Sequence, residues 1–157
     1  MRKFVTEHQS PYLDLTTEVS DILYRGHSQF QDIIVADSKE FGRMLVLDGV
    51  FQTSIKDEFM YHESIVHIPM FLHPNPKKVL IIGGGDGGAA REAVRHPEVE
   101  SVTMVDIDGK VIELSKQYFP EIAKAMIEGD PKLTVKVGDG IAFMREEIGR
   151  ASCRERV

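Results

Sequence analysis

The sequence predicts an α/β protein in which a small N-terminal antiparallel β-domain precedes the first half of a doubly wound parallel α/β domain. Three observations predict this class. An Asp-Gly pair separates two apolar runs in residues 44–54, an apolar strand pattern leads into the glycine-rich stretch GGGDGG, and strand and helix patterns then alternate up to residue 140. A chain of 157 residues with 42% apolar content is long enough for one small domain and part of a larger one.

Residues 1–55 are expected to form the β-domain. Residues 30–38 are rich in β-branched side chains and close in turn-forming residues. Asp48 and Gly49 then lie between two apolar runs. Such a pair is typical of a two-residue hairpin turn, because both central positions of that turn need positive φ. We therefore predict antiparallel strands on both sides of the pair.

Residues 56–77 are expected to form a connecting helix and a linker. Acidic residues occupy positions 57 and 58, where the helix dipole favours negative charge. Tyr61, Ile65 and Ile68 recur at helical spacing. Pro69 is expected to end or kink the helix, and the stretch HPNPKK (73–78) then predicts a turn-rich linker.

Residues 78–147 are expected to form the partial α/β domain. The uninterrupted apolar run VLIIGG predicts a parallel strand that is buried on both faces. Further elements are predicted as a helix in 88–96, a strand in 101–108, a helix in 109–119 and a strand in 133–140. This alternation is the first half of a doubly wound fold.

The final residues, 148–157, are expected to be non-native. Their sequence, IGRASCRERV, resembles the translation of a common sequencing adapter, and such scars are excluded from fold reasoning. The only cysteine, Cys153, lies in this stretch and so does not report the redox compartment. We therefore expect the natural protein to continue past Glu147. The alternative is a basic amphipathic C-terminal turn.

Charge and hydropathy exclude several function classes. The formal net charge of -6 argues against general binding to nucleic acid or to an anionic membrane, because phosphate groups would be repelled. No apolar run approaches the roughly 20 residues that span a bilayer. Glu7 and its polar neighbours interrupt any secretory signal at the start. We expect a cytoplasmic protein.

The glycine-rich stretch predicts a nucleoside-binding loop. Gly83, Gly85 and Gly88 satisfy the pattern G-x-G-x-x-G after a predicted strand and before a predicted helix, and Asp106 stands near the end of the next strand. Glycines let a ligand approach backbone that a Cβ atom would block, and the acid can accept hydrogen bonds from ribose hydroxyls.

Asp86 narrows the choice of nucleoside. A carboxylate about 5 Å from a pyrophosphate would oppose it by roughly 3 kcal/mol per unit charge at an effective dielectric of about 20. Asp86 therefore argues against NAD or ATP and favours a cationic ligand, such as an S-adenosylmethionine derivative. The alternative is a helix N-cap whose side chain points to solvent.

Four stretches, residues 45–63, 73–88, 96–112 and 137–140, closely resemble the spermidine synthases, the polyamine aminopropyltransferase family. The resemblance covers nearly all of the chain up to Glu147. It implies an N-terminal β-domain followed by a Rossmann-like domain of the S-adenosylmethionine-methyltransferase type. The implied reaction transfers an aminopropyl group from decarboxylated S-adenosylmethionine to putrescine, which gives spermidine and methylthioadenosine. The donor is a co-substrate, and no separate cofactor is implied.

The resemblance also implies roles for individual residues. Positions matching the donor site, which holds the methylthioadenosine portion, are Gln31, Gly83, Gly85, Asp106, Asp139 and Gly140. Positions matching the polyamine side are Tyr61, His62 and Asp86. The family's catalytic base is an aspartate in a later loop, expected beyond residue 147, so we expect little or no activity from this chain. Family members form dimers or tetramers.

Plainer interpretations compete with these roles. Without the resemblance, His62 would be interpreted as a core or surface histidine, Tyr61 as core and Gln31 as an ordinary strand-surface residue. Asp108 is predicted to be the N-cap of the helix that begins near Gly109. The two histidines of HESIVH are five residues apart and point to different sides of a helix, so a metal site is not expected.

Two rival function classes remain open at this point. One is an enzyme of the same fold with a different reaction or acceptor, either an S-adenosylmethionine-dependent putrescine N-methyltransferase or a longer-polyamine aminopropyltransferase. The other is a non-catalytic sensor of polyamines or nucleosides.

Overall fold

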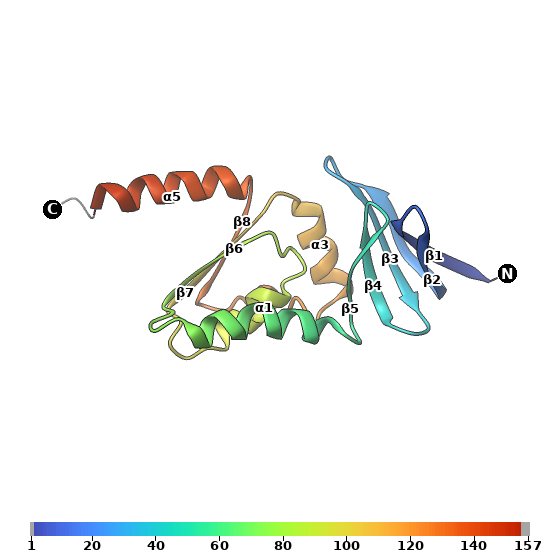
Figure 1. Ribbon diagram of the computed structural model, residues 1–157, viewed down its shortest axis with the longest axis horizontal. Coiled ribbons are helices and arrows are strands. Elements are labelled where there is room, and N and C mark those ends of the chain that lie inside the picture. Colours follow the sequence, from blue (N-terminus) through green and yellow to red (C-terminus); the bar gives the residue numbers. More distant parts are fainter. Residues whose placement is uncertain (1, 155–157) are drawn as a thin grey trace.

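The computed structural model describes residues 2–154, which form two β-sheets with five helices (Figure 1). The first sheet is antiparallel with the order β1-β2-β3-β4-β5, so each strand pairs with its neighbour in sequence. Its strands are β1 (Lys3–Ser10), β2 (Leu13–His27), β3 (Asp32–Ser38), β4 (Gly42–Leu47) and β5 (Val50–Ser54). The sheet curls so that the backbone N–H of Phe51 in β5 donates to Glu7 in β1 at 3.0 Å.

The β4–β5 hairpin confirms the prediction made from Asp48 and Gly49. Their φ values are 49° and 79°, both in the left-handed region that the two-residue turn requires. Asp48 also accepts a hydrogen bond from the backbone N–H of Asp32 at 2.8 Å through its side chain. The turn is therefore fixed to the start of β3 as well as to its own strands.

The second sheet is parallel, with the order β6-β7-β8, as the alternating pattern predicted. Its strands are β6 (Lys78–Ile82), β7 (Ser101–Asp106) and β8 (Leu133–Val137). The helices are α1 (Glu58–Leu72), α2 (Gly88–Val94), α3 (Gly109–Tyr118), α4 (Lys124–Glu128) and α5 (Gly140–Arg154). The short helix α4 was not predicted. No helix in residues 2–154 is both long and apolar enough to cross a membrane.

One apolar cluster joins the two sheets. Figure 1 shows α3 lying between the parallel sheet and the antiparallel sheet. Buried residues of β3 and β4 pack there against residues of α3 and of the segment that follows it, namely Ile33, Val35 and Leu45 against Val111, Leu114, Phe119 and Ile122. The guanidinium of Arg43 also donates to the backbone carbonyl of Tyr118 at 3.1 Å. The antiparallel sheet is thus covered by a helix of the α/β region.

The prediction that β6 is buried on both faces is wrong. Val79 and Ile81 pack into an apolar cluster with α1 and α2, but Leu80 and Ile82, which point to the other face, are 40% and 47% exposed. The reason is that α1 and α2 cover only the face of Val79 and Ile81, while the opposite face has no comparable cover among residues 2–154. Two-sided burial requires neighbours that the described residues do not supply.

Helix α1 differs from its prediction in two respects. Of the two outcomes predicted for Pro69, an end or a kink, the end does not occur, because the helix continues to Leu72. The Pro69 carbonyl accepts the backbone N–H of His73 at 3.0 Å. The apolar stripe that includes Tyr61 and Ile65 is largely exposed, whereas the buried residues are His62 and Val66. The buried face of α1 is therefore turned away from the apolar pattern, because α2 and its charged side chains pack against the other side.

The tail predicted to be non-native falls partly outside the described residues. The backbone of α5 runs from Gly140 to Arg154, and residues 155–157 lie outside the part of the chain that the structure describes.

Candidate functional site

The glycine-rich loop connects β6 to α2 at the carboxyl ends of the parallel strands, where open α/β sheets bind ligands. Gly83, Gly84 and Gly87 have φ values of 83°, 80° and 87°, in the left-handed region that other residues rarely adopt. A Cβ atom at Gly83 would meet nothing within 4 Å, so the loop is open on this side. The backbone near Gly83 is accessible to a ligand.

Asp106, at the end of β7, binds the glycine-rich loop through its side chain. Its Oδ2 accepts the backbone N–H of Gly85 at 2.8 Å, and its Oδ1 accepts the backbone N–H of Asp108 at 2.8 Å. A Cβ atom at Gly85 would lie 2.9 Å from this Oδ2. A larger residue at position 85 would therefore have to displace the Asp106 carboxylate, a reason for glycine that differs from the predicted access for a ligand.

The buried side chain of Asp108 has two roles, of which only the N-cap was predicted. It is the N-cap of α3, as predicted, and accepts the backbone N–H of Lys110 at 3.0 Å. Its other oxygen accepts the Ser28 hydroxyl at 2.7 Å and the Gln31 side-chain amide at 2.8 Å. Burial would raise the pKa of Asp108, but these hydrogen bonds outweigh it and lower the pKa below its usual value.

Gln31 therefore lies at the seam between the two sheets. It is half-buried and precedes β3, and its amide reaches across to Asp108 at the start of α3. The interpretation of Gln31 as an ordinary strand-surface residue is wrong. The structure places Gln31 beside Asp108, which is two residues from the ribose-binding candidate Asp106.

Asp139 and Gly140 follow β8 at the same edge of the sheet. The Gly138 N–H donates to the Asp106 carbonyl at 2.9 Å, so the ends of β7 and β8 are directly joined. Asp139 is exposed, and its Oδ1 accepts the N–H groups of Ile141 and Ala142 at 2.8 and 3.1 Å, which caps α5. The structure thus brings Asp139 to the same edge as Asp106.

Asp86 stands at the centre of the loop with both oxygens engaged. Its Oδ1 accepts the backbone N–H of Gly88 at 2.8 Å. Its Oδ2 lies 3.3 Å from Nε2 of His62, and the side chain is 16% exposed. The alternative of an N-cap pointing to solvent is wrong, because Gly87 is the N-cap of α2 and Asp86 is turned toward α1.

His62 connects Asp86 to two further charged side chains. It is 2% exposed, and its Nδ1 lies 2.6 Å from Oε2 of Glu58, one helical turn earlier. Arg91 of α2 donates to both carboxylate oxygens of Glu58, at 3.0 and 2.9 Å. We call this series of contacts, Arg91 to Glu58 to His62 to Asp86, the His62 network.

Opposing effects act on the pKa of His62. Burial disfavours the imidazolium and would lower the pKa, whereas the hydrogen bonds and negative charges of Asp86 and Glu58 raise it, and the net direction is upward. Both ring nitrogens face carboxylate oxygens, and only the protonated ring can donate to both. The arrangement therefore favours the imidazolium.

Tyr61 lies beside this network on the solvent side. Its side chain is 62% exposed, and its ring meets the His62 ring edge-on with centroids 5.4 Å apart. The interpretation of Tyr61 as a core residue is wrong. An exposed aromatic ring next to a carboxylate-bearing loop suits contact with an alkyl ammonium.

Glu58 and Arg91 are the charged residues that sequence reasoning missed. Glu58 was interpreted only as an acid that suits a helix start, although its spacing of one turn from His62 was a usable signal. Arg91 carries no predicted role in the sequence analysis above. Its contact with Glu58 joins two helices and has no local signature.

A second cluster involves the other histidine of α1. The Nε2 of His67 lies 3.3 Å from the buried carboxylate of Glu92, and its Nδ1 lies 2.9 Å from Nε2 of His96. His62 and His67 thus belong to separate clusters. Within the part of the chain that the structure describes, no three or more His, Cys, Asp or Glu residues are arranged to hold a metal ion.

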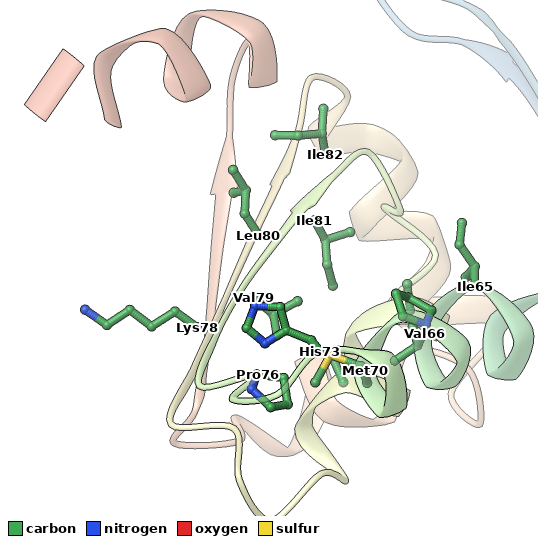
Figure 2. A pocket seen from close by; sticks show the side chains of 13 residues that line it. Ile65, Val66, Met70, His73, Pro76, Lys78, Val79, Leu80, Ile81 and Ile82 are labelled. Carbon is green, nitrogen blue, oxygen red and sulfur yellow. The ribbon is translucent and has the colours of Figure 1, made fainter. Parts of the chain in front are cut away.

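A groove of about 440 Å³ lies between α1 and β6, away from the glycine loop. Figure 2 shows its lining of apolar side chains, with Ile81 turned toward α1 and Leu80 on the other side of the strand. The lining includes none of Gly83, Asp86 or Asp106. This groove is an apolar surface of the α/β region and not part of the polar site.

The fold and the site together define a class of protein. A curled antiparallel sheet precedes a methyltransferase-like α/β region. The glycine loop of this region carries the carboxylate of Asp86. Asp106 at the end of β7 and Asp139 after β8 lie at the same edge of the sheet. This class is the methyltransferase-like α/β fold preceded by a curled antiparallel sheet.

The chain belongs to the spermine/spermidine synthase family. The family pattern described as the spermine/spermidine synthase domain matches residues 58–148, and the pattern described as the spermidine synthase tetramerisation domain matches residues 4–54. The resemblance inferred from the motifs is thereby confirmed.

Individual relatives agree with this assignment. The chain is 50% identical over 146 residues to the polyamine aminopropyltransferase of Caldicellulosiruptor bescii and 47% identical over 146 residues to that of Bacillus mycoides, with 93% of this chain matched in each case. It spans about half the length of these relatives, 52% in each.

Solved structures agree as well. The fold matches the spermidine synthase of Thermotoga maritima and a spermidine synthase in complex with the transition state analogue AdoDATO. Each has a TM-score of 0.88 and 39% identity, and the match covers 92% of this chain and 50% of the other chain.

Proposed function

We propose that the whole protein to which this chain corresponds is a spermidine synthase, which transfers an aminopropyl group from decarboxylated S-adenosylmethionine to putrescine. The observation that carries this proposal is the carboxylate of Asp86 at the centre of the glycine loop, oriented by Gly88 and His62. It suits an ammonium group and opposes a phosphate. The named relatives and the AdoDATO complex support the same reaction.

The donor side is proposed to lie along the ends of the three parallel strands. Asp106 would accept hydrogen bonds from the ribose hydroxyls, and the open backbone at Gly83 would let the nucleoside approach. The full set proposed to hold the methylthioadenosine portion is Gln31, Gly83, Gly85, Asp106, Asp139 and Gly140. The donor is consumed as a co-substrate, so we propose no resident cofactor.

The amine side is proposed to lie between α1 and the glycine loop, at Tyr61, His62 and Asp86. An alkyl ammonium has a pKa near 10.4, judged from lysine, so putrescine arrives as a dication. One ammonium must be held by negative charge, and the other must lose a proton before its nitrogen attacks the carbon beside the sulfonium. Asp86 supplies the first requirement, beside the exposed ring of Tyr61.

The proton acceptor for the second amine is expected beyond residue 147. We therefore expect this chain to bind the donor and yet to show little or no transferase activity. Turnover by the chain comparable to that of a full-length enzyme would contradict this part of the proposal.

Calorimetric titration of the chain with methylthioadenosine tests the donor side. Binding is expected, and Asp106→Asn is expected to weaken it about tenfold or more, which corresponds to roughly 1.4 kcal/mol. The control Glu113→Gln changes an exposed acid of α3 and should leave the affinity unchanged. Preferential binding of NAD or ATP would contradict the proposal.

An assay of the whole protein separates the rival reactions. Aminopropyl transfer from the decarboxylated donor to putrescine is expected. Methyl transfer from ordinary S-adenosylmethionine to putrescine would instead indicate the N-methyltransferase, and a preference for a longer amine would indicate another aminopropyltransferase. Donor binding without turnover by the whole protein would indicate a sensor.

The antiparallel sheet is proposed to mediate assembly into a homodimer or homotetramer, since residues 4–54 match a tetramerisation domain. Light scattering on the purified protein measures this directly. We propose that the enzyme acts in the cytoplasm.

A further inference from the structure

The His62 network contains more negative than positive charge unless its histidine is protonated. The negative charge of Glu58 is paired with Arg91, which donates hydrogen bonds to both carboxylate oxygens. Asp86 has no arginine or lysine partner among the contacts that the structure describes, and its nearest cationic candidate is the imidazole of His62 at 3.3 Å. The net charge at Asp86 therefore depends on the protonation of one buried ring.

We propose that His62 is a proton-linked positioning residue for Asp86: its protonated ring holds the carboxylate between α1 and the glycine loop, and an ammonium ligand that binds Asp86 displaces this proton. This inference rests on the proposed function, because it takes Asp86 to be the amine-binding carboxylate. His62 lines the proposed amine side but is only 2% exposed, so the effect inferred here is the one that it exerts through Asp86.

The geometry restricts how His62 can respond. Glu58 and Tyr61 face its ring from α1, Asp86 faces it from the loop, and Arg91 of α2 acts on it through Glu58. The ring fills the space at Gly88 that a Cβ atom would occupy, so it packs directly against the backbone at the start of α2. The ring is held in place, and its remaining freedom is to gain or lose a proton.

Competition between two cations for Asp86 follows from these contacts. Without a ligand, the imidazolium donates to Glu58 and Asp86 and satisfies both. When an ammonium ion contacts Asp86, two positive charges would share one carboxylate in a site with little solvent, which disfavours the imidazolium. The ring then releases its proton to the solvent and stays hydrogen-bonded to Glu58 as a neutral donor. No covalent bond changes other than the N–H bond that the ring gives up.

By linkage, amine affinity and protonation of His62 oppose each other. Binding of putrescine should release up to one proton per site where His62 is protonated, and none at higher pH, where His62 is already neutral. The apparent affinity for the amine should accordingly rise with pH until His62 is neutral. A histidine with a purely structural role would show no such dependence.

NMR titration of the histidine rings in the chain tests this inference. The His62 signals are assigned by their loss in His62→Gln, and the pKa is measured with methylthioadenosine present, with and without putrescine at matched ionic strength. Putrescine is expected to lower the pKa of His62 by about one pH unit or more, a tenfold change in the protonation equilibrium. Calorimetry in buffers of different ionisation enthalpy should count the released proton.

Two variants and one internal control sharpen the measurement. Asp86→Asn should lower the pKa of His62 and abolish its response to putrescine, and Glu58→Gln should lower the pKa while the response persists. His67 is the control, because it lies on the same helix but faces Glu92 and His96. Its ring signals should not respond to putrescine.

The outcomes separate this inference from the proposed function. If methylthioadenosine binds and putrescine leaves the pKa of His62 unchanged, the inference is overturned and the proposed donor site stands. If methylthioadenosine does not bind but putrescine shifts His62 through Asp86, the linkage holds and the proposed function is contradicted. If neither ligand has an effect, both are overturned.

Discussion

The antiparallel and parallel sheets differ in how completely residues 2–154 bury them. In β3, Ile33 and Val35 are fully buried because α3 and the segment after it cover their face, and Ala36 on the other face is buried in a second cluster within the curled sheet. In β6, Leu80 and Ile82 are 40% and 47% exposed. The antiparallel sheet therefore depends on the α/β region for its cover, whereas the parallel sheet has one strand with a face that residues 2–154 leave open.

The largest expected effect comes from removing the side chain that joins the two sheets. Phe119 is fully buried in the cluster between α3 and the antiparallel sheet. Phe119→Ala should lower the free energy of unfolding by about 3–5 kcal/mol, because it leaves a cavity in this interface. Urea denaturation followed by circular dichroism measures the loss. Phe59→Ala, at a half-exposed position on α1, is the control, and an equal loss there would contradict the prediction.

A matched pair of aliphatic truncations compares the two sheets directly. Ile33→Ala in β3 should cost about 2–5 kcal/mol of unfolding free energy. Leu80→Ala in β6 should cost about 1 kcal/mol or less, since a large part of this side chain already contacts solvent. If the two variants lost the same unfolding free energy in urea, β6 would be as well buried as β3, and the inferred difference between the sheets would be wrong.

A smaller effect is expected at the glycine loop. Gly88 packs against the ring of His62, and a Cβ atom there would collide with it. Gly88→Ala should destabilise the chain by about 1–3 kcal/mol, as overpacking does, and should displace the His62 ring signals in NMR spectra. Gly138→Ala is the control, because a Cβ atom there would meet nothing within 4 Å. Gly129→Ala is unsuitable, because its positive φ would strain an alanine.

The smallest expected effect is a pH dependence of stability that originates in His62. Its folded-state pKa is raised above the unfolded value near 6.5, so the native state binds more protons in this range. The contribution is fully present below about pH 6.5 and is lost as the pH rises through the raised pKa. A pKa that differs by one pH unit between the two states corresponds to about 1.4 kcal/mol. Urea midpoints across this range measure the contribution. His62→Gln should remove this dependence, and its persistence in that variant would assign it to another group.

Features with a local cause were predictable from sequence. The Asp48-Gly49 turn and the Asp108 N-cap each depend on the conformation and hydrogen bonds of a few adjacent residues, and the structure has both. The strand and helix alternation likewise follows from local periodicity. Family motifs then identified Asp86 and Asp106, which the structure brings to the same loop.

Features that depend on distant partners were not predictable. The apolar stripe of α1 suggested burial of Tyr61 and Ile65, but the face that meets α2 carries His62 instead. The carboxylates of Glu58 and Asp86 face the His62 ring there, and Arg91 pairs with Glu58. The contact of Gln31 with Asp108 joins residues far apart in sequence. Burial of β6 depends on strands and helices beside it, which its own apolar sequence does not specify.

The edge position of β6 has a practical consequence for work with the chain in solution. Its outer side presents backbone N–H and C=O groups that β7 does not use, and Lys78 is the only charge on the strand to discourage another strand from pairing there. Together with exposed Leu80 and Ile82, this edge is a template for intermolecular pairing. Concentrating the chain should therefore favour self-association through β6, and Leu80→Lys should improve its solubility without disturbing the glycine loop.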